Sequence, residues 1–311
     1  MPDILLRILE TQAELTEVEL LQRIIWPDSD LEVVPSHLLL ASIHNGGLLI
    51  GAFEPAAKDE APASVAPGPD ESTLVGFVFS FPGVYHTPDG PRLKHHSHML
   101  GVLPSHRDRR IGFMLKRAQW QMVRHQGLDR ITWTYDPLLS RNAHLNITHL
   151  GAVCSTYFPN YYGEMRDGIN LGTPSDRFQV DWWVNSRRVT RRLGKQPRQA
   201  LDLAHYLAAG TPILNPSGVG PNDLPLPNKA QTEQVLASLR PDENPLVLLE
   251  IPSDFQALKA RDPDLALAWR LHTRAFFTGL FEAGYLVTDF VYLKGTHSRS
   301  FYVLCYGEST L

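Results

Sequence analysis

The segment from residue 95 to residue 126 constrains the fold of this chain more than any other. Residues 97–103 are apolar enough for a buried strand, and Pro104 ends it because proline has no N–H for a sheet ladder. The basic turn SHRDRRIG follows, and an amphipathic helix is predicted to begin at about Arg109. Because the first amides of a helix lack intrahelical acceptors, this basic turn predicts an anion-binding site.

Composition limits the classes of function. A chain of 311 residues predicts about two domains, and a net charge of −4 argues against a broad nucleic-acid surface. Cys154 and Cys305 are too few for a disulfide framework or a four-cysteine zinc site. The sequence begins without a signal-peptide pattern and lacks a run of about 18 apolar residues. We therefore expect a soluble, cytoplasmic protein that acts on a small molecule, away from membranes.

The order of the predicted elements indicates the fold class. A short strand at residues 4–9 precedes a helix capped by Thr11, and strands follow at residues 48–54 and 72–84. The strand, turn and helix of residues 95–126 come next. This order predicts an α+β fold with a mixed, mostly antiparallel sheet flanked by helices, and it disfavours the repeated βαβ units of a Rossmann fold.

A basic connection after Val184, NSRRVTRRLGKQPRQALD, marks the predicted domain boundary. We expect one domain at residues 1–190 and a smaller α+β domain at residues 191–311, with a long helix at residues 265–281. The second domain contains no second phosphate-binding turn. It is expected to support the acceptor site or a homodimer.

The basic turn resembles the pyrophosphate loop of GNAT-type N-acyltransferases, whose signature is Arg or Gln, two residues, Gly, one residue, then Gly or Ala. Arg107 and Gly112 match this signature, and Arg110 stands where the first glycine would be. A glycine there lets the backbone approach the diphosphate of coenzyme A. We therefore expect Arg110 to hold an ordinary helical conformation with its side chain turned away.

A second segment also resembles the GNAT superfamily. Asn142 and Ala143 precede a predicted helix that ends at Leu150-Gly151-Ala152, as in the second GNAT motif. A wider similarity to a longer bacterial group of predicted GNAT acetyltransferases covers most of the chain, including WTYDPLLSRNAHLN and YYGEMRDGINLGTPSDRF. The resemblance implies a GNAT-like domain at residues 1–190 and allows a degenerate GNAT-like half after it.

The resemblance also implies an activity and its donor site. It predicts transfer of an acetyl or succinyl group from acetyl-CoA or succinyl-CoA to the amine of a small acceptor, such as an amino acid, by direct attack. An acyl-enzyme is not expected, because Cys154 has no nearby His/Asn pattern. The residues implied for coenzyme A binding are Leu100, Gly101, Val102, Arg107, Asp108, Arg109, Arg110, Ile111, Gly112 and Asn142.

The sequence does not identify the group that protonates the leaving thiolate of coenzyme A. Many GNAT members carry a tyrosine where this chain has Ile147. His149 and Tyr162 are nearby candidates, and Tyr157 and Tyr161 are the predicted catalytic tyrosines. Each tyrosine could equally be a core or rim residue.

The attacking amine needs a base, because an alkylammonium has a pKa near 10. His98 on the predicted strand at residues 97–103 is the predicted base, since its side chain shares a face with Leu100 and its ordinary pKa suits the task. It could instead be a hydrogen-bonded strand histidine. His96 and His98 also suggest a metal pair, but the sequence offers no third ligand and no metal is predicted.

The acceptor is expected against the loop at residues 156–184, which is rich in Tyr, Asn, Gly and Asp. A rigid loop packed on the sheet edge is the alternative. Candidate residues for the acceptor and its carboxylate are Asn160, Tyr161, Asp167, Asn170, Arg166, Arg177, Arg187, Arg188, Arg270 and Arg274. Arg270 and Arg274 could instead form a surface ion-pair row.

Two other functions fit the sequence. Because Arg110 and Ile147 depart from the family pattern, the chain could be a non-catalytic coenzyme A sensor that presents its C-terminal half to a partner. A phosphate-binding protein without enzyme activity is the other alternative.

Overall fold

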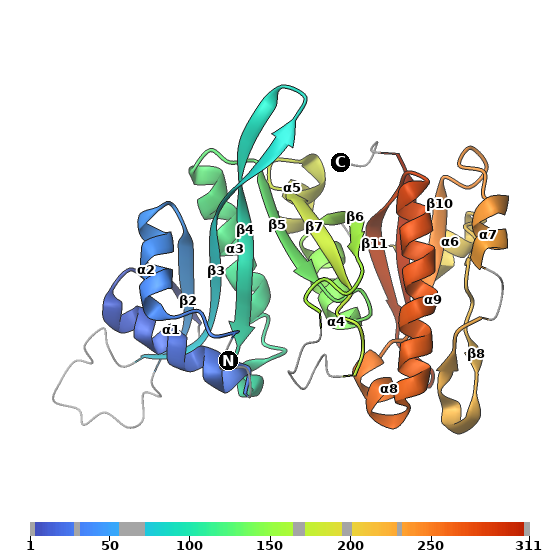
Figure 1. The fold of residues 1–311 in the computed structure, drawn as a ribbon, viewed down its shortest axis with the longest axis horizontal. Coiled ribbons are helices and arrows are strands. Elements are labelled where there is room, and N and C mark those ends of the chain that lie inside the picture. Colours follow the sequence, from blue (N-terminus) through green and yellow to red (C-terminus); the bar gives the residue numbers. More distant parts are fainter. Residues whose placement is uncertain are drawn as a thin grey trace. The chain divides into compact units, whose positions relative to one another are not determined.

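A computed structural model describes residues 4–27, 32–55, 72–163, 172–194, 201–228 and 232–307 of the chain. The chain divides into two compact units, Met1–Ile131 and Thr132–Leu311. Figure 1 shows the elements of both units, coloured along the sequence.

The first unit is an antiparallel sheet of strands in the order β1-β2-β3-β4 with helices on both faces. Its elements are β1 (Leu5–Ile8), α1 (Gln12–Ile25), α2 (Ser36–His44), β2 (Leu48–Pro55), β3 (Ser72–Thr87), β4 (Gly90–Val102), a 3₁₀ turn (Pro104–His106) and α3 (Ile111–His125). Strand β5 (Arg130–Tyr135) follows and runs across the division between the units.

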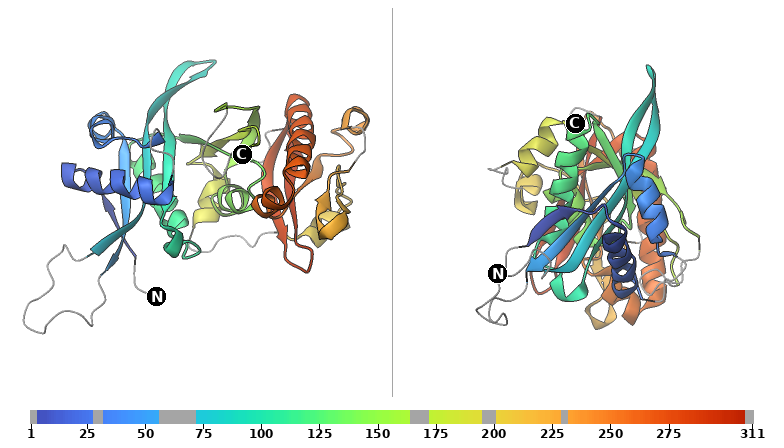
Figure 2. Two further views of the ribbon diagram at one scale, coloured as in Figure 1. Left: turned by 60° about the horizontal axis from the view of Figure 1, so that its bottom comes forward. Right: turned by 90° about the vertical axis from the view of Figure 1, so that its left-hand side faces the viewer.

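The sequence of the first unit explains its layers. The Thr11 side chain accepts from the backbone N–H of Glu14 and the Glu14 side chain accepts from that of Thr11, so the predicted cap of α1 is confirmed. Phe77 and Phe79 pack with α1 and α2, whereas Val78, which lies between them in the sequence, packs with α3. Val75 also packs with α3, because β3 has an extra residue at this point: Gly76 pairs with Ala52 and Leu74 pairs with Phe53. Figure 2 shows these helices on either side of the strands.

The second unit holds strands in the order β5-β7-β6-β11-β12-β10. Its strands are β6 (Val153–Phe158), β7 (Arg177–Trp183), β10 (Leu246–Ile251), β11 (Tyr285–Leu293) and β12 (Arg299–Tyr306), with the short pair β8 (Gly218–Val219) and β9 (Pro225–Leu226). Its helices are α4 (Ser140–Ala143), continued by a π-helix (His144–His149), α5 (Arg187–Leu193), α6 (Leu203–Ala208), a 3₁₀ turn (Pro221–Asp223), α7 (Thr232–Ser238), α8 (Phe255–Arg261) and α9 (Pro263–Glu282).

Two ion pairs attach α9 to distant parts of the second unit. The Arg270 guanidinium binds both carboxylate oxygens of Asp136, and these side chains are 1% and 6% exposed. Arg274 binds both oxygens of Asp176, at 2.9 and 2.7 Å. Residues just after β5 and just before β7 are therefore held by one helix. The predicted surface ion-pair row is wrong, because the carboxylate partners are buried.

The predicted α+β class, its mostly antiparallel pairing and its element order are confirmed. The compact units, however, meet at residue 131 and not at residue 190. The physical reason is that β6 pairs with β11, and that α9 binds Asp136 and Asp176, so residues 132–190 pack with the C-terminal segment. The prediction that residues 191–311 are a degenerate GNAT-like half stays a prediction.

Replacing Arg270 with methionine should lower the free energy of unfolding by about 3–5 kcal/mol, because Asp136 would stay buried without its partner. Urea unfolding followed by circular dichroism measures this. Replacing the exposed Arg261 with methionine is the control and should change stability little. Equal stability of the Arg270→Met variant and the wild type would show that the pair does not hold α9.

Candidate functional site

The turn between β4 and α3 has an unusual backbone. Asp108 and Arg110 both adopt left-handed conformations, with φ values of 66° and 62°, and α3 begins at Ile111. The helix therefore begins two residues after the predicted start at about Arg109, and the expectation that Arg110 is helical is wrong. Arg110 is the N-cap, and it takes the conformation that glycine adopts at the least cost. Arg110 thus adopts the left-handed conformation at the position where the GNAT signature has its first glycine.

Glu54 at the end of β2 fastens this turn to the sheet. Its carboxylate accepts hydrogen bonds from His106 Nε2 at 2.8 Å and from Arg109 Nη2 at 2.7 Å. The hydrogen bond from His106, followed by that from Arg109, holds the pKa of Glu54 below its ordinary value. Glu54 lies far from the turn in sequence and carries no local signal, so sequence analysis missed it.

The remaining arginines of the turn are exposed. The Arg107 backbone N–H donates to the Pro104 carbonyl at 3.3 Å, its side chain is exposed, and the guanidinium of Arg110 lies 5.3 Å from the ring centroid of Phe113. Because Arg109 neutralises Glu54, the turn keeps an excess of positive charge beside the first amides of α3. This combination of charge and amide donors fits a diphosphate.

Strand β4 has a β-bulge at His98. Ser97 pairs with Ser80 and Met99 pairs with Phe79, so His98 is the additional residue. The pairing resumes through residues 100–102, which include the predicted contacts Leu100, Gly101 and Val102. A bulge interrupts the alternation of side chains, so the two-residue spacing does not place His98 and Leu100 on one face as predicted.

The ring of His98 lies among other rings. Its centroid is 6.1 Å from that of His96, 5.8 Å from that of Phe81 and 6.1 Å from that of Phe79. Although His98 is exposed, partial loss of hydration lowers its pKa below the ordinary value, and loss of hydration lowers the pKa of His96 to about 4. Both imidazoles are therefore mainly neutral at neutral pH. No group of three or more potential metal ligands occurs among the described residues.

A buried polar cluster behind the bulge was not predicted. Lys116 Nζ donates to Ser97 Oγ at 2.8 Å and to Gln119 Oε1 at 3.2 Å, and Gln119 Nε2 donates to Ser97 Oγ at 3.1 Å. Nearby, His95 Nδ1 lies 3.0 Å from Ser80 Oγ. A signal was present in the sequence, because Lys116 and Gln119 share helical spacing with the buried Val123.

The remaining predicted residues lie in the second unit. Asn142 is half-buried in α4, and Ile147, where many GNAT members carry tyrosine, is a core residue at 0% exposure. Its helix is a π-helix, in which the rings of His144 and His149 lie 4.5 Å apart. Apolar packing therefore explains Ile147.

The predicted catalytic tyrosines have different surroundings. The Tyr157 hydroxyl donates to Asp176 at 2.6 Å, and burial, followed by the charge of Asp176, raises the pKa of Tyr157. Tyr161 is exposed and stacks on Phe158. Tyr162 shares a hydrogen bond of 2.9 Å with Thr134. Tyr157 is thus a weak acid engaged by a carboxylate, and the catalytic role of either predicted tyrosine stays a prediction.

Most candidate groups for the acceptor have protein partners. Arg270 and Arg274 are bound by buried carboxylates, and Asp176 also accepts from the backbone of Asn160. Arg188 Nε donates to the Gly151 carbonyl, and Arg177 is buried. Arg187 on α5 is exposed. Arg166, Asp167 and Asn170 lie outside the described residues.

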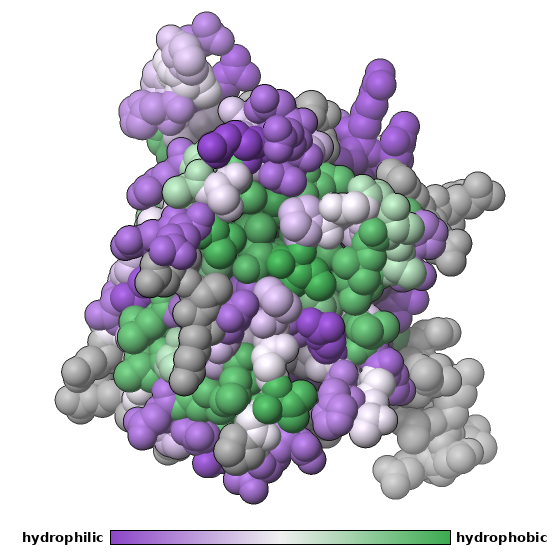
Figure 3. All heavy atoms as spheres, turned by 90° about the vertical axis from the view of Figure 1, so that its right-hand side faces the viewer, coloured by the Kyte–Doolittle hydropathy of each residue, from purple (hydrophilic) through white to green (hydrophobic). Residues whose placement is uncertain are grey.

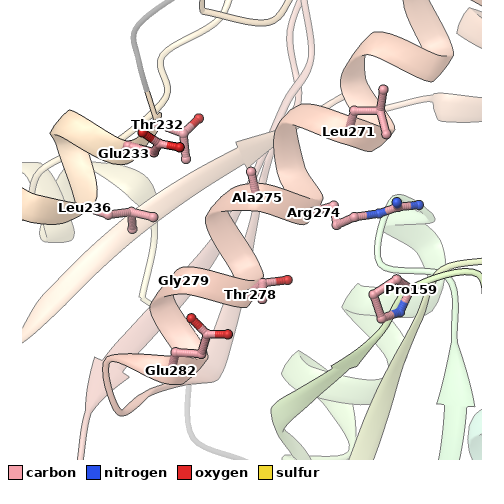
Figure 4. Close-up of a pocket in the computed structure, with 10 residues that line it drawn as sticks. All are labelled: Pro159, Thr232, Glu233, Leu236, Leu271, Arg274, Ala275, Thr278, Gly279 and Glu282. Atoms are coloured by element: carbon pink, nitrogen blue, oxygen red, sulfur yellow. The ribbon is translucent and has the colours of Figure 1, made fainter.

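A groove of about 710 Å³ lies between α7 and α9 (Figure 4). Its lining residues include Thr232, Leu236, Thr278 and Arg274, whose guanidinium is already bound to Asp176. Figure 3 shows the side of this unit that lies at the right in Figure 1, where apolar side chains gather. The turn and the bulge contribute no residue to this groove, so it is not part of the candidate donor site.

Among the described helices, none has both the length and the apolar character needed to cross a membrane.

Neither a protein-family model nor a curated protein sequence matches this chain. The chain is similar to Arabidopsis thaliana NAA60 in complex with acetyl-CoA, with 16% identity, a TM-score of 0.45, and coverage of 59% of this chain and 100% of that chain. It is similar to aminoglycoside 6'-acetyltransferase type Ii (16% identity, TM-score 0.40, 59% and 99% covered). It is also similar to an acetyltransferase of the GNAT family from Streptococcus pneumoniae (12% identity, TM-score 0.42, 58% and 98% covered). At such identities and TM-scores the likenesses carry no argument about activity, and the function must be inferred from the geometry.

Replacing His95 with glutamine should reduce the loss of stability in acid. Burial lowers the pKa of His95 to about 4, below the value of about 6.5 in an unfolded chain, so the unfolded state binds more protons between these values. The contribution is present above about pH 6.5 and is lost as the pH falls toward 4. Urea unfolding at a series of pH values measures it. The exposed His125→Gln variant is the control and should follow the wild type, and a His95→Gln curve parallel to both would contradict this assignment.

Proposed function

We propose that this chain is a coenzyme A-dependent N-acyltransferase of the GNAT type, which moves an acetyl or succinyl group to the amine of a small acceptor. The observation that carries the proposal is the path from the bulge at His98 to α3. On this path Asp108 and Arg110 take left-handed conformations directly before the helix. Amides at the start of a helix together with cationic side chains bind phosphate oxygens well.

Different residues of the turn would bind different parts of the acyl-CoA donor or support those that do. Arg107, Arg110 and the backbone at Ile111 and Gly112 would hold the diphosphate. Arg109 would stay on Glu54, so that this carboxylate does not repel the ligand. The backbone of residues 100–102 would face the thioester, and Asn142 of the second unit stays a predicted contact.

The chemistry would be direct attack by the amine. His98 would take the proton of the acceptor, directly or through water, because its lowered pKa keeps it neutral near pH 7. An acyl-enzyme on Cys154 is disfavoured, since burial raises the pKa of this thiol well above its ordinary value and its exposed fraction is 0%. Which of Tyr157 and Tyr161 protonates the thiolate stays a prediction.

Replacing Arg107 with glutamate should weaken the binding of coenzyme A by about 1–3 kcal/mol, roughly a 5- to 150-fold increase in Kd, because a charge-assisted contact becomes a repulsion. Isothermal titration calorimetry measures the affinity. Arg117→Glu makes the same charge change on the exposed side of α3 and should alter Kd much less. An unchanged Kd for Arg107→Glu would remove the basis of the donor site.

The acceptor we propose is an amino acid, whose carboxylate would need an arginine. Arg187 is the exposed candidate among the described residues, since Arg270 and Arg274 are bound to Asp136 and Asp176. An amino acid should then be a better acceptor than its decarboxylated amine, and Arg187→Met should raise KM for the amino acid with little change in kcat. Steady-state kinetics on such pairs of amines decide this. Arg191→Met on the same helix is the control, and equal kcat/KM for both members of each pair would exclude the carboxylate contact.

A non-catalytic coenzyme A sensor is the second candidate. Its support is Ile147, a buried core residue where many GNAT members carry a proton donor. The sensor predicts tight binding of coenzyme A with no turnover of acetyl-CoA or succinyl-CoA by any amine. A homodimer and a cytoplasmic location stay predictions.

A further inference from the structure

The polar cluster behind the bulge is unusual because all three members are buried. Ser97, Lys116 and Gln119 are 5%, 2% and 0% exposed, and each is hydrogen-bonded to the other two. They lie at the interface between α3 and β4, whose other buried residues include Ile111 and Leu115. Burial lowers the pKa of Lys116 well below its ordinary value. A buried amine costs stability that an apolar residue of the same length would not, so stability alone does not account for Lys116.

The cluster lies where the register of β4 changes. Ser97 is the last residue in register with β3 before the additional residue, His98. The hydrogen-bond ladder between β3 and β4 is regular on both sides of the bulge. If the bulge moved by one position along β4, most hydrogen bonds of this ladder would therefore stay intact. Such a slip would, however, turn the Ser97 side chain to the other face of the sheet. Lys116 and Gln119 would then lose the hydroxyl that they share, which disfavours the slipped register.

We infer that Lys116 is a positioning residue for the proposed acyl transfer: together with Gln119 it binds Ser97 and thereby fixes the β4 bulge at His98. The inference rests on the proposed function, because it assigns His98 and the following amides to the reacting groups. Lys116 itself touches neither donor nor acceptor. By fixing the bulge, Lys116 would determine that β4 presents the ring of His98 and the peptide groups of residues 100–102 to the donor and the acceptor.

The test is the Lys116→Met variant, which keeps the length of the side chain and removes its N–H donors. We expect kcat to fall roughly 10- to 100-fold, as misplaced catalytic groups do, while Kd for coenzyme A stays within about twofold of the wild type. Thermal unfolding should show that Tm is not lowered. The control is Arg117→Met, which removes the neighbouring exposed cation of α3 and should leave all three quantities unchanged.

Two further measurements separate positioning from a general structural effect. The imidazole ¹³Cε1–¹H signal of His98 should shift or split in Lys116→Met and stay in place in Arg117→Met. Ser97→Ala should reproduce the loss of kcat. The double variant with Lys116→Met and Ser97→Ala should lose no more kcat than either single variant, because both substitutions remove the same contact, that between Lys116 and Ser97. Additive losses would overturn the inference.

The inference is also overturned if Lys116→Met keeps the wild-type kcat and His98 signal, or if kcat, Tm and coenzyme A affinity all fall together. Failure of the proposed function is recognised separately, since the wild type would then neither bind coenzyme A nor turn over an acyl-CoA. In that case the position of the His98 imidazole signal in Lys116→Met, compared with Arg117→Met, still decides whether Lys116 fixes the bulge.

Discussion

The first unit depends on how the chain turns from β4 into α3. Left-handed residues other than glycine cost about 1–2 kcal/mol each, and this turn contains two of them. Glu54 offsets that cost by holding His106 and Arg109 against the end of β2. The same contact occupies one arginine and leaves Arg107 and Arg110 exposed. One carboxylate therefore stabilises the turn and determines which of its cations can meet a ligand.

The second unit depends on a different kind of contact. Its two bidentate ion pairs join α9 to carboxylates that are buried, and Asp176 in addition accepts from Tyr157 and from the backbone of Asn160. Such a carboxylate must keep its partners, because an unpaired charge in this position is costly. The segment that includes Tyr157 and Asn160 is thus held to α9, and Tyr157 serves packing and hydrogen bonding before any role in proton transfer.

Local patterns predicted most of the elements but not their long-range contacts. The cap at Thr11, strand β5 and helix α9 lie where periodicity, capping and proline predicted them, because those signals act over a few residues. The compact units divide at residue 131 and not at residue 190, because residues 132–190 contact the C-terminal segment through the long-range pairing of β6 with β11. The conformation of Arg110 was wrong because arginine usually avoids positive φ, so only its tertiary setting explains the choice. Within the candidate site, the basic turn could be located from sequence, whereas Glu54 and the bulge at His98 could not.

If the proposed acceptor reacts beside His98, the surroundings of this ring would also affect the charge of the acceptor amine. The rings of Phe79, Phe81 and His96 lie next to that of His98, and lost hydration lowers the pKa of His98 and of His96. The same loss of hydration would lower the pKa of an alkylammonium placed there, since desolvation disfavours any charged form. The fraction of neutral, nucleophilic amine would rise before a base acts. A weakly basic imidazole would then be sufficient as proton acceptor, because the amine would already hold its proton less tightly.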